Sequence, residues 1–178
     1  MKTATKSADD PIAEDAGTFG KYVLVFSVAL VIVIADQITK IWVDTDMTLY
    51  QSIPIIDGFF SLTYVRNTGA AFSMFADMSE TYRVPFFLAV AAIAVVGILY
   101  FVYSTPRSQK MVLLACGFVL GGAVGNLIDR VAYGSVIDFL DVYWGDWHWP
   151  AFNVADSFIS IGVGLLLLSS FFAKDPPS

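Results

Sequence analysis

The stretch VPFFLAVAAIAVVGILYFVY, residues 84–103, decides the fold class of this chain. It contains no charged side chain. A bilayer core about 30 Å thick needs about 20 apolar residues in a helix that rises about 1.5 Å per residue. The stretch is therefore predicted to be a transmembrane helix.

Three further segments, 22–43, 111–128 and 151–173, have similar length and character. Hydrophobic residues make up 57% of the chain and charged residues 15%, whereas a soluble domain carries about 25% charged residues. The mean hydropathy is +0.69. These values predict an all-α integral membrane protein with four transmembrane helices, formed by residues 21–174. Residues 1–20 are polar and are expected to be a disordered cytoplasmic tail, because they offer no core to bury.

Basic residues in short loops predict the orientation. With the N-terminus inside, the cytoplasmic side holds Lys2, Lys6, Lys21, Arg107, Lys110 and Lys174, and the outer side holds Lys40, Arg66, Arg83 and Arg130. Both termini are therefore expected to be cytoplasmic. The net charge of −6 and the absence of a basic cluster argue against a nucleic-acid partner.

Two outer segments carry further patterns. Residues 44–80 include FFSLTYV (59–65), whose alternation and β-branched and aromatic residues predict a strand. We therefore expect a small extracytoplasmic β-sheet between the first and second helices. The segment YWGDWHW (143–149) resembles an interfacial aromatic belt before the fourth span. Its His148, the only histidine, is expected to pack there.

Ionisable side chains inside spans are costly and need a reason. Asp36 and Lys40 lie one turn apart near the outer end of the first span, either as a simple interfacial ion pair or in a substrate-side role. The motif GNLIDR closes the third span with Asn126, Asp129 and Arg130. The glycines of GGAVG (121–125) are expected to allow close helix packing.

Two aspartates are candidates for a catalytic pair. Asp138 lies between apolar neighbours in GSVIDF, and Asp156 would lie about 8 Å along a fourth helix that began at Ala151. Asn153 is expected to donate a hydrogen bond to Asp156. Two close carboxylates in a poor dielectric share one proton, which supplies a base for water and an acid for the leaving nitrogen in amide hydrolysis.

Other chemistries fit less well. The chain lacks a GxSxG motif and HExxH spacing, and its single cysteine, Cys116, lies in an apolar run. A Mg²⁺ or Ca²⁺ site built from Asp138, Asp141 and Asp146 is an open alternative. A proton- or ion-coupled transporter is another, although the inner halves of two spans are almost entirely apolar. A non-catalytic membrane assembly factor would leave the outer clustering of polar residues unexplained.

Four blocks of the chain resemble the bacterial lipoprotein signal peptidases (signal peptidase II): ADQITK (35–40), VRNTGAAFSMF (65–75), GGAVGNLIDRVAYGSVIDF (121–139) and PAFNVADSFI (150–159). The resemblance implies a membrane aspartic endopeptidase that cleaves a prolipoprotein before its diacylglyceryl-modified cysteine. It implies a multi-pass protein of the bacterial inner membrane, whose active site faces the periplasm or outer surface and whose small sheet rests on the membrane.

The resemblance also assigns residues and partners. It implies that Asp138 and Asp156 are the catalytic dyad, supported by Asp36, Lys40, Asn67, Gly69, Asn126, Asp129, Arg130 and Asn153. No metal or other cofactor is expected. The expected partners are the lipidated prolipoprotein, membrane lipid and the inhibitor globomycin, and the protein is expected to be a monomer.

Overall fold

The computed structural model of the chain describes residues 11–69 and 79–172. Its elements, in chain order, are α1 (Pro11–Asp46), β1 (Ser52–Ile56), β2 (Phe60–Asn67), α2 (Glu80–Ser104), α3 (Lys110–Tyr133), β3 (Val136–Trp144), β4 (Trp147–His148) and α4 (Val154–Phe172). All four helices are long and apolar enough to cross a membrane. The predicted fold class, four membrane helices with a small sheet, is confirmed.

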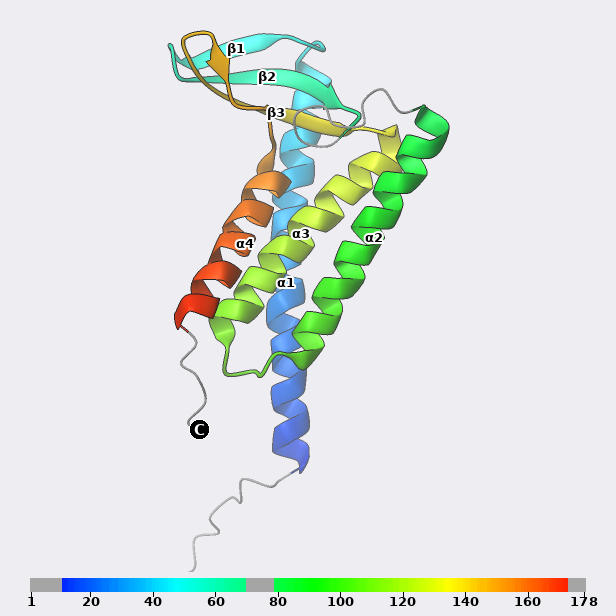
Figure 1. Cartoon of the computed structure of the whole chain (residues 1–178), viewed down its shortest axis with the longest axis vertical. Helices are drawn as coiled ribbons and strands as arrows, with labels where there is room; N and C mark the ends of the chain where they lie inside the picture. The colour runs from blue at the N-terminus through cyan, green and yellow to red at the C-terminus, as the bar shows by residue number, and fades with distance from the viewer. Residues whose placement is uncertain (1–10, 70–78, 173–178) are drawn as a thin grey trace, which may run out of the picture.

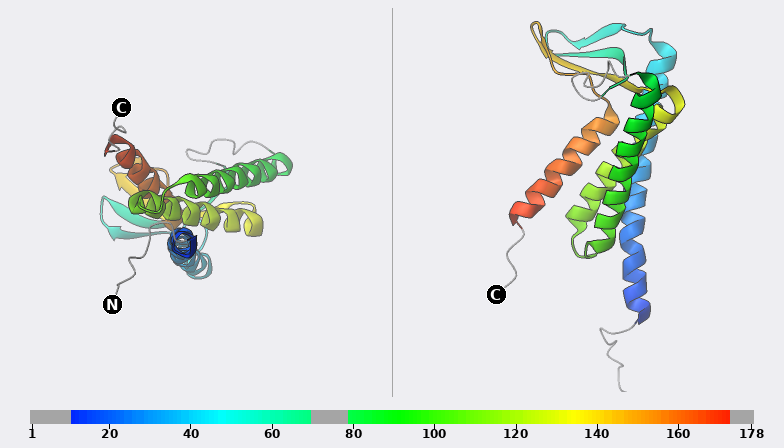
Figure 2. Two further views of the ribbon diagram at one scale, coloured as in Figure 1. Left: turned by 90° about the horizontal axis from the view of Figure 1, so that it is seen from below. Right: turned by 45° about the vertical axis from the view of Figure 1, so that its right-hand side comes forward.

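Helix α3 occupies the centre of the bundle, with α1, α2 and α4 packed around it (Figure 1). Half of its apolar window is buried, compared with 6% of the α2 window and 11% of the α4 window. Helix α4 leans away from the other three at the end that carries the C-terminus (Figure 2). The outer faces of α2 and α4 are therefore left for lipid.

Glycines explain how closely the helices approach α3. A Cβ atom added to Gly121 would lie 2.8 Å from the carbonyl oxygen of Ala29 on α1. One added to Gly122 would lie 2.4 Å from the carbonyl oxygen of Ala155 on α4. Real Cβ contacts are not this short, so only glycine fits at these positions. The close packing predicted for GGAVG is confirmed.

The sheet covers one end of the bundle (Figure 1). Its strands are all antiparallel in the order β1-β2-β3-β4. β2 confirms the strand predicted from FFSLTYV, and its Tyr64 packs with Val43 of α1 and Phe139 of β3 in a buried cluster. The other two strands, β3 and β4, come from the connection between α3 and α4. The sheet therefore joins a chain segment that precedes α2 to one that follows α3.

Three boundaries differ from the sequence-based expectations. α1 begins at Pro11, so residues 11–20 are helical where a disordered tail was expected, and residues 1–10 lie outside the described residues. α3 continues past the predicted end at residue 128 to Tyr133, where Gly134 ends it in a left-handed conformation (φ 69°). α4 begins at Val154, so Asp156 lies in its first turn, rather than about 8 Å along it.

Candidate active site

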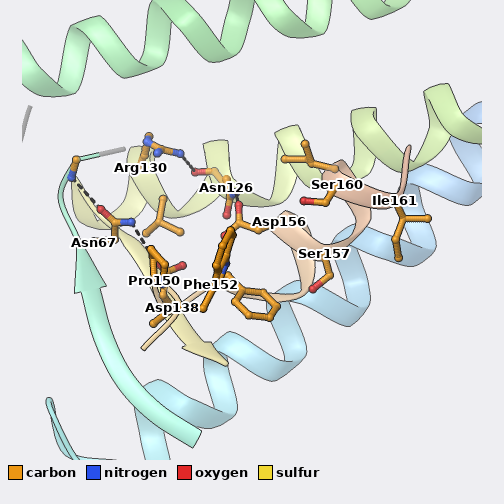
Figure 3. Close-up of a pocket in the computed structure, with 15 residues that line it drawn as sticks. Asn67, Asn126, Arg130, Asp138, Pro150, Phe152, Asp156, Ser157, Ser160 and Ile161 are labelled. Atoms are coloured by element: carbon orange, nitrogen blue, oxygen red, sulfur yellow. Dashed lines mark hydrogen bonds between the residues drawn. The ribbon is translucent and has the colours of Figure 1, made fainter. Parts of the chain in front are cut away.

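A cavity of about 600 Å³ opens where α3, α4, β2 and β3 meet, at the sheet end of the bundle. It is lined by Asn67, Gly69, Asn126, Arg130, Val136, Asp138, Trp149, Pro150, Ala151, Phe152, Asp156, Ser157, Ile159, Ser160 and Ile161 (Figure 3). The cavity therefore brings together both candidate catalytic aspartates. It also contains four of the eight predicted supporting residues.

Asp138 is held from both sides by amide groups. Its side chain is 2% exposed, and β3 pairs with β2 so that Val65 lies opposite it and Asn67 is a diagonal neighbour on the same face. Nδ2 of Asn67 donates to its Oδ2 at 2.9 Å, and Nδ2 of Asn153 donates to its Oδ1 at 2.8 Å. Burial, helped by the nearby charge of Asp156, raises the pKa of Asp138 from 3.8 to about 7.

Asp156 enters the same cavity from α4. Nδ2 of Asn126 on α3 donates to its Oδ1 at 2.7 Å. Among the described residues no side chain or backbone group bonds its other oxygen, Oδ2. Because Asp156 lies in the first turn of α4, the partial positive charge of the helix N-terminus favours a negative charge there.

The side chain of Asn153 has two roles, one through its oxygen and one through its nitrogen. Its Oδ1 accepts from the backbone N–H of Asp156 at 2.9 Å, so Asn153 is the N-cap of α4. This bond turns its Nδ2 toward Asp138 and also toward Oδ1 of Asn126 at 3.1 Å. The expectation that Asn153 donates to the Asp156 carboxylate was wrong, because its amide nitrogen faces the other aspartate.

The orientation of Asn126 follows from its surroundings. Its Oδ1 accepts from Nζ of Lys40 at 2.9 Å and from Asn153. An amide whose oxygen faces two donors must turn its nitrogen to the other side, where Asp156 lies. Lys40 therefore contributes to the site indirectly, by fixing which end of the Asn126 amide meets the Asp156 carboxylate.

Lys40 lies in a buried ionic cluster behind the cavity. Its Nζ is 2.8 Å from Oδ2 of Asp36 and 2.9 Å from Oδ2 of Asp129, and all three side chains are at most 1% exposed. The ion pair expected between Asp36 and Lys40 is present, but it is not a simple interfacial pair, because Asp129 shares the same lysine. It is buried within the protein instead of lying at the membrane surface. Charges this deeply buried persist only when they are paired and hydrogen-bonded.

Gln37 belongs to the same cluster, and sequence analysis missed it. Its Nε2 donates to Oδ1 of Asp129 at 3.0 Å, to Oδ2 of Asp36 at 3.2 Å and to the carbonyl oxygen of Gly125 at 3.2 Å. The available signal was an uncharged polar residue next to Asp36 inside an otherwise apolar span. A polar group at such a depth needs a partner, and the partner lies on α3.

The remaining predicted residues complete the site. Gly69 donates its backbone N–H to Oδ1 of Asn67 at 3.0 Å, which directs the Asn67 amide nitrogen toward Asp138. Arg130 lines the cavity with its guanidinium carbon 5.0 Å from the centre of the Phe87 ring. Part of the second signature block, residues 70–75, lies outside the described residues.

The carboxylates proposed as an alternative metal site are dispersed. On the sheet, away from Asp138, the carboxylate of Asp141 is hydrogen-bonded to the hydroxyl of Thr63 at 3.0 Å and to the His148 ring at 2.9 Å. Asp146 is exposed in the β3–β4 turn. Among residues 11–69 and 79–172, no three His, Cys, Asp or Glu side chains are placed to hold a metal ion. His148 stacks on Tyr143 with ring centres 4.9 Å apart, consistent with the predicted packing role.

The structure is a membrane-helix bundle with two aspartates lining one cavity, and comparisons with known proteins show that it is a membrane enzyme. The family model described as Signal peptidase (SPase) II matches residues 28–172. The lipoprotein signal peptidase of Geobacter sulfurreducens is 54% identical over 141 residues, which cover 79% of this chain and 86% of the relative. The lipoprotein signal peptidase of Alteromonas mediterranea is 49% identical over 145 residues, which cover 82% of this chain and 79% of the relative.

Solved structures of bacterial membrane enzymes share the fold. A bacterial membrane enzyme determined at 2.3 Å by the in meso method superimposes with a TM-score of 0.76 at 31% identity, covering 86% of this chain and 93% of its own. A second bacterial membrane enzyme, determined at 1.9 Å, superimposes with a TM-score of 0.73 at 32% identity, covering 85% of this chain and 94% of its own. The chain belongs to the signal peptidase II family, the membrane aspartic peptidases that remove signal peptides from prolipoproteins.

Proposed function

We propose that Asp138 and Asp156 are the catalytic pair with which this chain cleaves a prolipoprotein before its diacylglyceryl-modified cysteine. The observation that carries the proposal is that both carboxyl groups line one cavity and are held by neutral amides. An amide donor orients a carboxylate without neutralising it. The pair is thus left to bind a proton, in keeping with the pKa of about 7 for Asp138.

The chemistry needs one protonated and one ionised carboxyl group. The ionised group takes a proton from a water molecule, whose oxygen attacks the scissile carbonyl carbon. The resulting tetrahedral intermediate breaks its C–N bond as the protonated group transfers its proton to the leaving nitrogen. The products are the carboxyl end of the signal peptide and the free amino group of the lipidated cysteine. Oδ2 of Asp156 is open to such a water molecule.

The position of the site suits a lipid-anchored substrate. The acyl chains of the modified cysteine hold the scissile bond near the membrane surface, and the cavity lies at the sheet end of the bundle. We propose that this end faces the periplasm or outer surface and that both termini are cytoplasmic. The basic residues Lys21, Arg107 and Lys110 lie at the opposite end, which the positive-inside rule favours as the cytoplasmic side from the sequence count of six basic residues against four. We further propose that residues 21–174 form the catalytic domain.

The test is cleavage of a lipidated precursor peptide, followed by mass measurement of both products. Asp138→Asn and Asp156→Asn should each reduce cleavage by at least about a thousandfold, as removal of one member of a catalytic unit does elsewhere. Asp141→Asn is the matched control, because Asp141 is a mostly buried carboxylate of the same strand outside the cavity. Turnover near the wild-type level in either dyad variant would reject the assignment.

Two further measurements address metals and inhibition. We propose that the pair works without a metal ion, so cleavage should survive excess chelator; complete loss that added Mg²⁺ or Ca²⁺ restores would revive the carboxylate–metal alternative. We also propose that globomycin inhibits cleavage by occupying the cavity. Inhibition should therefore be competitive with the lipidated peptide, and a noncompetitive pattern would place the inhibitor elsewhere.

The oligomeric state can be measured directly. We propose that the chain acts as a monomer, because Asp138 and Asp156 of the same chain line one cavity and the proposed chemistry needs no residue from a second copy. Mass determination in detergent or nanodiscs, combined with activity at several protein concentrations, tests this. Specific activity that falls on dilution would contradict it.

A further inference from the structure

Arg66, near the end of β2, joins three elements at the rim of the active site. Its Nη2 lies 2.6 Å from Oδ1 of Asp44 on α1, and its Nε donates to the hydroxyl of Tyr64 at 2.7 Å. The Tyr64 hydroxyl in turn donates to the same Asp44 oxygen. The three side chains therefore form a closed ring of hydrogen bonds between α1 and β2.

The third element is α3. The guanidinium carbon of Arg66 lies 4.5 Å from the centre of the ring of Tyr133, the last residue of α3. A guanidinium over an aromatic face at this distance is attracted by the ring quadrupole. Burial and the bond to Asp44 raise the pKa of Tyr64, so its hydroxyl remains protonated and keeps donating. Arg66 thus contacts the ends of both α1 and α3.

The neighbour of Arg66 is Asn67, the last residue of β2 and a donor to Asp138. Successive residues of a strand point to opposite faces, so Arg66 turns away from the cavity while Asn67 turns into it. The cluster formed by Asp44, Tyr64, Arg66 and Tyr133 thus clamps the strand one residue before a catalytic hydrogen bond. A local shift of the strand end would move the Asn67 amide directly.

We propose that Arg66 is a positioning residue, which holds the end of β2 so that Asn67 keeps its hydrogen bond to Asp138. The inference rests on the proposed role of Asp138. The Asp44 and Arg66 side chains remain 30% and 22% exposed, and partly exposed ion pairs contribute little to global stability. The cluster therefore acts on the geometry of the site far more than on the stability of the fold.

The first experiment separates positioning from folding. Arg66→Met keeps the apolar stem but removes every contact of the guanidinium. It should lower kcat by about tenfold or more, the scale expected for a displaced catalytic contact, while the melting temperature in detergent stays close to that of the wild type. Arg66→Lys, which retains a charge but not the planar fork, should recover part of the loss.

Tyr133 supplies a matched pair of variants. Tyr133→Phe keeps the ring beneath Arg66 and should have wild-type kcat. Tyr133→Leu removes the ring and should lower kcat in the same direction as Arg66→Met. Equal kcat in the two Tyr133 variants would remove α3 from the proposed clamp.

A double-mutant cycle with Asn67 is decisive. Asn67→Ala removes the donor itself, so adding Arg66→Met to it should produce little further loss. A full additional tenfold loss in the Asn67→Ala background would overturn the inference, as would an Asn67→Ala variant with wild-type kcat. Failure of the proposed function is distinguishable, because it would appear as activity in Asp138→Asn whatever the outcome of this cycle.

The pH profile gives a readout that a purely structural role would not move. A hydrogen bond donated to a carboxylate favours its charged form, so losing the Asn67 bond raises the pKa of Asp138. Asp156, Lys40 and Arg130 carry the charges around Asp138, and they are unchanged in the variants. The kcat/KM profile of Arg66→Met should therefore move to higher pH, as in Asn67→Ala. An unshifted profile would contradict the inference.

Discussion

The backbone N–H of Ala155, in the first turn of α4, donates to Oδ1 of Asp36 on α1 at 2.9 Å. The next N–H, that of Asp156, is bound by the side chain of Asn153. The N-terminus of α4 is therefore capped by its own N-cap residue and by a carboxylate of the first helix. This contact fixes the height of Asp156 relative to α1, and through Lys40 it is connected to the Asn126 amide.

The hydrogen bond between Asp36 and the backbone N–H of Ala155 depends on the small size of Gly125, which packs against the Asp36 carboxylate. A Cβ atom added there would lie 2.6 Å from Oδ2 of Asp36, so Gly125→Ala must displace the carboxylate that caps α4. We expect lower cleavage activity and a lower melting temperature. Gly97→Ala on α2 is the control, because nothing lies within 4 Å of its added Cβ, and it should be neutral or slightly stabilising. Similar behaviour of the two variants would argue against the packing explanation.

Lys40→Met should be strongly destabilising. It leaves the carboxylates of Asp36 and Asp129 buried without their cation, and breaking a buried ion pair in this way costs about 3–5 kcal/mol. The melting temperature in detergent measures the loss. Lys21→Met, which removes a lysine that binds backbone carbonyl groups at the other end of the bundle, should have a smaller effect. Adding Asp129→Asn to Lys40→Met should restore part of the stability, and a further loss would count against the explanation.

The two roles of Asn153 can be separated by substitution. Asn153→Ala removes both the N-cap of α4 and a donor to Asp138, and the cap alone is worth about 1 kcal/mol. Asn153→Ser offers an oxygen for the cap but no amide nitrogen for Asp138. We therefore expect Asn153→Ser to have a higher melting temperature than Asn153→Ala, and both variants to have a low kcat. Recovery of kcat by Ser would show that the donor to Asp138 is dispensable.

The stability of the protein should depend on pH through Asp138. Its pKa in the folded state, about 7, lies above the ordinary value of 3.8, because the folded environment disfavours the charged carboxylate. The contribution of this group to stability is thus fully present below pH 3.8 and is lost as the pH rises through about 7. Asp138→Asn removes this dependence, so its melting temperature relative to wild type should be higher at about pH 8 than at about pH 5. An equal difference at both pH values would contradict the raised pKa.

Several features of this protein followed from the sequence alone. The four spans were predictable because hydropathy over about 20 residues is a local property of the chain. The strand at residues 59–65 was predictable for a similar reason, since alternation is visible within a few residues. The resemblance of the signature blocks to a known family implied that Asp138 and Asp156 belong to one site. Even the glycine contacts of α3 could be anticipated from the spacing of small residues in a membrane helix.

Only the tertiary structure decided which donor meets which carboxyl group. Sequence analysis paired Asn153 with Asp156 because the two are one turn apart, yet its nitrogen binds Asp138, and Asp156 is bound by Asn126, 30 residues earlier. Gln37 was missed because two of its three hydrogen-bond partners, Gly125 and Asp129, lie on α3. Such pairings depend on the rotation and depth of whole helices and on the register of β2 against β3, which are set by packing over the entire bundle. No local window of sequence contains that information, since each bond depends on the placement of two distant elements at once.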